Sequence, residues 1–78
     1  MSKKIYEWNS FEIWQDEDKY YAIYDVGMFG EVFRRDEITK EEAHLACRGP
    51  EHATTMLLEL ERRLRAAGID PHKGNMDV

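Results

Sequence analysis

The sequence predicts an α+β domain: a three-stranded antiparallel β-meander, then a short helix and a long amphipathic helix packed on one sheet face (β-β-β-α-α). Two observations support this prediction. Aromatic and β-branched residues, which favour strands, are concentrated in the first half of the chain. In residues 50–67, by contrast, apolar side chains recur every three or four positions, which is the period of a helix. Strands followed by helices are typical of the α+β class.

The first strand is predicted over residues 4–15, KIYEWNSFEIWQ. The apolar alternation changes phase at Asn9-Ser10, which indicates either a β-bulge or a tight turn between two short strands. We favour a bulge or bend. The polar residues Asp16 to Lys19 predict a hairpin turn into a second strand over 20–26. Residues 27–30, GMFG, predict the next turn, and 31–35 predict the third strand.

Two helix starts are marked. Thr39 and Glu42 have the spacing of a capping box, and the short helix that follows must stop before Gly49-Pro50. Proline is favoured at the first position of the next helix, and Gly68 is suited to end it. The apolar stripe of this long helix comprises Ala53, Met56, Leu57, Leu60, Leu64 and Ala67.

At 78 residues the chain predicts one domain, residues 1–71, followed by a disordered tail, 72–78. The net charge of −5 disfavours binding to a nucleic-acid backbone, which requires clustered Lys and Arg. One cysteine cannot form an internal disulfide, and neither a signal peptide nor an apolar run long enough to span a bilayer is recognisable. We therefore expect a cytoplasmic location and no membrane partner.

Residues suited to chemistry are few. His44, Cys47, His52 and His72 could contribute zinc ligands, but they do not form four ligands at a recognised spacing. His44 and Cys47 also lack an orienting third group for nucleophilic catalysis. The sequence predicts no metal, no cofactor and no enzymatic activity.

Both Trp residues, all four Tyr residues and all three Phe residues precede residue 34. Helices can cover only one face of a three-stranded sheet, so some rings should be left uncovered, and an exposed aromatic patch usually marks a binding surface. Trp14 has the opposite parity to Phe11 and Ile13, so it points outward if those two are core. The predicted partner-binding residues are Trp8, Trp14, Tyr20, Tyr24, Asp16, Glu17 and Asp18.

These features predict a small acidic module that acts by protein–protein docking, with another protein or a second copy in a homodimer as partner. An inhibitor of antitoxin or phage anti-defence (anti-CRISPR-like) type is one form of such a module. The alternative is a single-stranded nucleic-acid-binding domain that uses the same rings; a third interpretation leaves the rings as core alone. The hairpin DEDKYYAIYDV loosely resembles that of partial RNase-H-like antitoxins, but their Pro and Gly signature is missing and no family is assigned.

Overall fold

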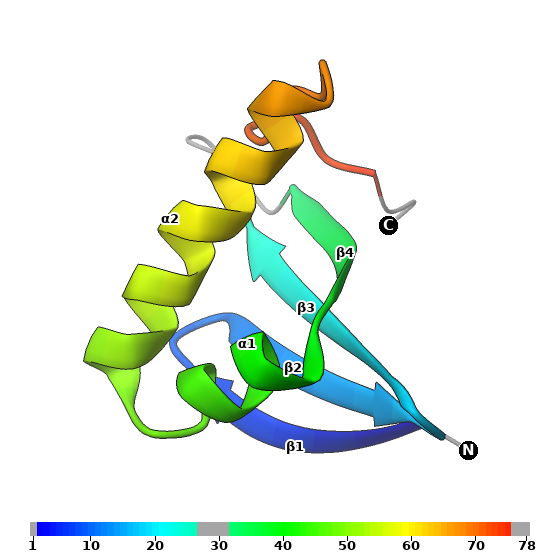
Figure 1. Cartoon of the computed structure of the whole chain (residues 1–78), viewed down its shortest axis with the longest axis vertical. Coiled ribbons are helices and arrows are strands. Elements are labelled where there is room, and N and C mark those ends of the chain that lie inside the picture. Colours follow the sequence, from blue (N-terminus) through cyan, green and yellow to red (C-terminus); the bar gives the residue numbers. More distant parts are fainter. Residues whose placement is uncertain (1, 27–31, 76–78) are drawn as a thin grey trace.

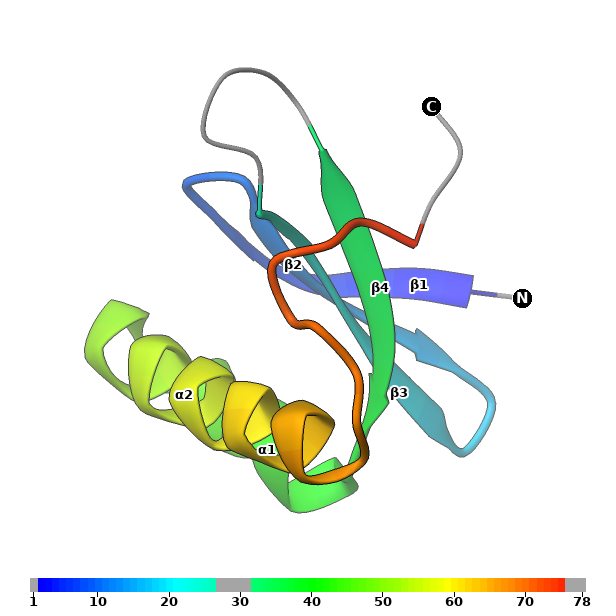
Figure 2. The same cartoon turned by 90° about the horizontal axis from the view of Figure 1, so that it is seen from above.

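The computed structural model describes residues 2–26 and 32–75. It confirms the α+β class, with an antiparallel sheet in the order β1-β2-β3-β4 and two helices on one face of it (Figures 1 and 2). The elements are β1 (Ser2–Trp8), β2 (Phe11–Asp16), β3 (Lys19–Asp25), β4 (Phe33–Ile38), α1 (Lys40–Ala46) and α2 (Pro50–Ala66).

The predicted number of strands is wrong, because the expected first strand is a hairpin. Asn9 and Ser10 both have positive φ values, 49° and 66°, and Trp8 pairs directly with Phe11. Positive φ at both central residues is typical of the two-residue turns that match strand twist. Residues that flank such a turn differ by three in number yet share a face, so the hairpin itself produces the phase change. The ladder does shift register between Lys4 and Tyr6, but not at Asn9-Ser10.

The remaining hairpins follow the predicted order. Asp16 pairs with Lys19 at the tip of the β2–β3 hairpin, where the polar turn is predicted. The predicted turn at residues 27–30 lies outside the described residues. β4 begins at Phe33 and extends to Ile38, so it ends later than the strand predicted over 31–35.

Both helices begin where the sequence predicts and end one residue before the predicted end, with Cys47 and Ala67 as C-caps. Thr39 Oγ1 accepts from the Glu42 N–H at 3.1 Å, and the Glu42 carboxylate accepts from the Thr39 N–H at 2.8 Å, which completes the capping box. After α2, Gly68 takes a φ of +79°, and the Ile69 N–H donates to the Leu64 carbonyl at 2.9 Å. That bond belongs to the Schellman motif, which satisfies carbonyls that a helix end would otherwise leave unpaired.

The core lies between the sheet and the helices. Ala22 of β3 is fully buried, as are Ala43 and Ala46 of α1, and these small side chains allow close approach of helix and sheet. The largest fully buried side chains are Ile13, Met56 and Leu60. The other buried hydrophobic residues are Phe11, Tyr20, Tyr24, Ile38, Ala53 and Leu64.

The charged side chain of Arg34 is buried on the helix side of β4. Its Nε and Nη2 donate to the two Asp36 carboxylate oxygens at 2.8 and 3.0 Å, and the Tyr24 hydroxyl donates to Asp36 Oδ2 at 2.7 Å. Burial of the phenol, reinforced by the Asp36 carboxylate, raises the pKa of Tyr24 well above its ordinary value of 10.0. The network satisfies polar groups that would be costly to bury alone.

Residues 69–75, here called the C-terminal strap, lie against β4 (Figure 2). Arg34 Nη1 donates to the Lys73 carbonyl at 2.8 Å. The Asn75 side chain accepts from the Arg35 N–H at 2.7 Å and donates to the Arg35 carbonyl at 2.8 Å, as a paired strand residue would. A Cβ at Gly74 would come within 2.9 Å of the Phe33 carbonyl oxygen, so the strap approaches closely only because glycine stands there. The sequence does not predict these contacts in the first part of the 72–78 tail.

Candidate protein-docking face

The face of the sheet that the helices do not cover, here called the outer face, carries two aromatic side chains at its centre. Trp14 of β2 and Tyr21 of β3 are direct partners in the ladder, so their side chains lie side by side. Lys4 of β1 pairs with Trp14, and Glu37 of β4 pairs with Tyr21, which extends the row across all four strands. Ile23 follows Tyr21 on the same side. Trp14, Tyr21 and Ile23 are all partly exposed.

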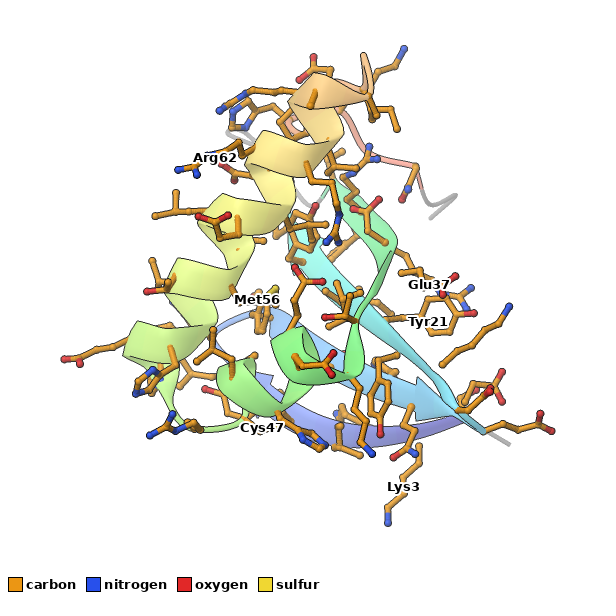
Figure 3. All side chains as sticks on the ribbon, in the orientation of Figure 1. Lys3, Tyr21, Glu37, Cys47, Met56 and Arg62 are labelled. Atoms are coloured by element: carbon orange, nitrogen blue, oxygen red, sulfur yellow. The ribbon has the colours of Figure 1, made fainter. Side chains whose placement is uncertain are left out.

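Side-chain contacts hold the two rings in defined surroundings. Trp14 Nε1 donates to the Glu12 carboxylate at 2.8 Å, and Lys4 Nζ lies 3.8 Å from the same carboxylate. The Arg35 guanidinium carbon lies 4.2 Å from the centre of the Tyr21 ring, a cation–π contact. Figure 3 shows Tyr21 and Glu37 extending from the side of the sheet away from α2.

The outer face is hollowed beside the rings. A shallow depression of about 230 Å³ is lined by Ser2, Trp14, Asp16, Tyr21, Ile23 and Arg35. Its lining combines aromatic and aliphatic side chains with the charged Asp16 and Arg35. This arrangement resembles the centre and rim of a protein interface more than an enclosed site for a small molecule.

The predicted binding residues fall into two groups. Trp14 and Asp16 line the outer-face depression, and Glu17 and Asp18 are exposed in the adjoining hairpin turn. Tyr20 and Tyr24, in contrast, are only 8% and 3% exposed because they face the helices. Their description as uncovered aromatic residues is therefore wrong.

Trp8 lies on the helix side of the sheet, at its margin. It is 47% exposed and borders a groove of about 150 Å³ together with Ala53, Thr54 and Leu57 of α2. Tyr24 and Phe11 also line this groove. Trp8 is thus an uncovered aromatic residue, but it does not share a face with Trp14.

The sequence-based prediction missed the contribution of Tyr21, Ile23 and Arg35 to the outer face. Both parities of β3 carry apolar or aromatic residues, so alternation could not separate the covered from the uncovered side. The available signal was Ala22. A small side chain between Tyr20 and Tyr24 indicates the side that a helix approaches closely.

The residues weighed for chemistry are scattered. Cys47 ends α1 and is exposed, and partial desolvation of its thiol raises the pKa, which disfavours the reactive thiolate. His44 packs edge-on against Tyr20, whereas His72 lies beside Arg65. Within residues 2–26 and 32–75, no three His, Cys, Asp or Glu side chains are grouped so that they could hold a metal ion.

Neither described helix has the length and apolar character needed to cross a bilayer. Comparisons with known proteins identify no relative of this chain. No protein-family model matches the chain, and no significant match is found to a curated protein or to a solved structure.

Proposed function

We propose that this protein is a docking module that binds another protein through the outer face of its sheet. The observation that carries the proposal is the pair Trp14 and Tyr21, which lie side by side and partly exposed on the face without helices. Tryptophan and tyrosine dominate the energetics of many interfaces because they bury large areas with little loss of side-chain freedom.

The core does not require these two rings. Met56 and Leu60 of α2 are 1% exposed and pack against the other face of the sheet. Trp14 and Tyr21 therefore give little to helix packing, and their apolar surface is available to a partner. The surrounding charges would form the polar rim that orients such a partner.

A single-stranded nucleic-acid binder would use the same rings for base stacking. Charge favours a protein partner instead. The outer face carries the acids Glu7, Glu12, Asp16, Asp25 and Glu37, against the bases Lys4, Lys19 and Arg35. Lys4 is already paired with Glu7 and Glu12, so little positive charge is left for phosphates.

The partner is another protein, and a second copy of this chain in a homodimer belongs to the same proposal. The small size and acidic charge are compatible with an inhibitor of antitoxin or phage anti-defence type acting in the cytoplasm. A docking surface of this kind requires no cofactor and no catalytic residue.

The test compares Trp14→Ala with Leu58→Ala. Leu58 is the most exposed large hydrophobic residue described, at 58%, and lies on α2, so it controls for the loss of any exposed apolar side chain. Tagged wild-type and variant proteins are expressed in the source cells, and co-purifying proteins and the mass of the native assembly are measured. We expect Trp14→Ala to lose the partner or the dimer while Leu58→Ala keeps it. Equal retention by both variants would contradict the proposal.

A further inference from the structure

We infer that the outer face is built to take an arginine side chain of a basic partner segment, stacked on Trp14 and Tyr21 and ion-paired with Glu37. This inference rests on the proposed docking function and specifies the chemistry of the partner. It needs an aromatic platform, a carboxylate beside it and an excess of negative charge around both.

The protein itself contains the contact that the inference requires. The Arg35 guanidinium lies 4.2 Å from the centre of the Tyr21 ring, so this platform already accepts a guanidinium on one side. Trp14 lies on the other side of Tyr21 across the strand pair. Indole is the strongest aromatic partner for a cation, so a second guanidinium is favoured there.

The orientation of Trp14 is set by Glu12. This carboxylate accepts the indole N–H at 2.8 Å and lies 3.8 Å from Lys4 Nζ. Because the N–H is engaged by a carboxylate within the same strand, the faces of the indole, rather than its polar edge, are what the ring offers a partner.

Glu37 supplies the counter-charge. It is the direct ladder partner of Tyr21 and is exposed (Figure 3). Among the residues that the structure describes, none pairs with its side-chain carboxylate; Arg63 contacts only its backbone carbonyl. A guanidinium above the rings is therefore in the same row as a carboxylate with which no described base forms an ion pair. Lys19, Lys40 and Arg63 border the hollow beside Glu37 but do not pair with its carboxylate.

Arginine fits this site better than lysine. A guanidinium is planar, stacks on rings and can donate two parallel hydrogen bonds to one carboxylate, whereas an ammonium is a strongly hydrated point charge. The wider surroundings have a net negative charge, since Asp16, Glu17 and Asp18 of the depression and the adjoining turn outnumber the bases Lys19 and Arg35 beside them.

The experiment titrates the ¹⁵N-labelled full chain with three blocked synthetic peptides of equal length, which alternate serine with arginine, lysine or glutamate. The Trp14 indole N–H and the Tyr21 and Glu37 amides report binding. We expect the arginine peptide to move these signals and to bind about 3- to 10-fold more tightly than the lysine peptide. The glutamate peptide should move none of them.

Two variants of equal net charge sharpen the test. Glu37→Gln should weaken binding of the arginine peptide about threefold. Glu59→Gln, on the exposed side of α2 beside Arg62, should leave this binding unchanged. Equal weakening by the two variants, or arginine and lysine peptides that bind alike, would overturn the inference, because either result indicates unspecific charge attraction.

The outcomes separate this inference from the proposed function. If no arginine peptide moves the Trp14 signal, yet Trp14→Ala still abolishes a native partner complex, the docking function stands and the arginine specificity is wrong. If the arginine peptide shifts only residues on the helices, the inference is likewise overturned.

Discussion

The two faces of the sheet carry aromatic residues on the same strands, and they use them differently. On the helix side, Tyr20 and Tyr24 are buried, and the Tyr24 hydroxyl donates to Asp36. On the outer face, Trp14 and Tyr21 are partly exposed, and their polar contacts come from charged side chains at the surface. Residue type therefore does not decide burial. Register and the neighbouring side chains do.

The most damaging change should be one that opens the covered face. Met56 is 1% exposed between α2 and the sheet, so Met56→Ala should lower the free energy of unfolding by about 2–5 kcal/mol through lost burial and a residual cavity. Urea denaturation measures it. Leu58→Ala, on the exposed side of the same helix, should change the free energy of unfolding by no more than about 0.5 kcal/mol. Equal losses of stability in the two variants would contradict the burial of Met56 and the exposure of Leu58.

A second change concerns the buried phenol of the covered face. Burial raises the pKa of Tyr24 above 10.0, so the folded state keeps this proton where the unfolded state loses it. The contribution of the protonated Tyr24 hydroxyl to the free energy of unfolding is fully present below pH 10. It is lost as the pH rises above 10, by at most about 1.4 kcal/mol per pH unit. The Tyr24→Phe variant should therefore lose less stability than the wild type as the pH rises above 10. The Tyr21→Phe variant should lose as much as the wild type. Urea titrations between pH 8 and pH 11 provide the measurement.

The C-terminal strap should contribute less. Asn75→Ala removes two hydrogen bonds to the Arg35 backbone at an exposed site and should cost about 1–2 kcal/mol. Hydrogen exchange of the Arg35 amide, which donates to Asn75, should accelerate in the variant. Unchanged exchange there would indicate that the strap does not protect this edge of the sheet.

The smallest effect on stability should come from the outer face. Trp14→Ala removes a partly exposed ring that packs against no helix, and it should lower stability by less than about 1 kcal/mol. Thermal and urea unfolding measure it. If the domain instead unfolds, Trp14 belongs to the core and cannot be a dispensable docking anchor.

Much of the fold was predictable from local chemistry. The Thr39 capping box, the Gly68 helix end and the apolar stripe of α2 depend on residues close in sequence, and the structure contains them. Ala67 is the exception in the predicted stripe, because it is an exposed residue at the C-cap. The first hairpin was misjudged because a two-residue turn and a bulge produce the same change of phase. Asn9, which tolerates positive φ, was the local indication of a turn.

The candidate site was harder to predict because it depends on pairing between strands. The orientation of Trp14 followed from its parity with Phe11 and Ile13. Nothing local indicates that Tyr21 is its neighbour, or that Arg35 lies over Tyr21, since those contacts follow from the ladder register. The buried hydrogen bond from Tyr24 to Asp36 likewise links residues on different strands. It explains why a tyrosine can be accommodated in the core.

The most direct test of the docking surface replaces residue 14 with the photo-crosslinking amino acid p-benzoylphenylalanine and, in a separate protein, replaces residue 59. Both proteins are irradiated in the source cells, and covalent adducts are identified by mass spectrometry. The outer-face account predicts a discrete protein adduct, or a covalent dimer, from position 14 and none from position 59. Adducts from position 59 alone, or from neither position, would contradict it.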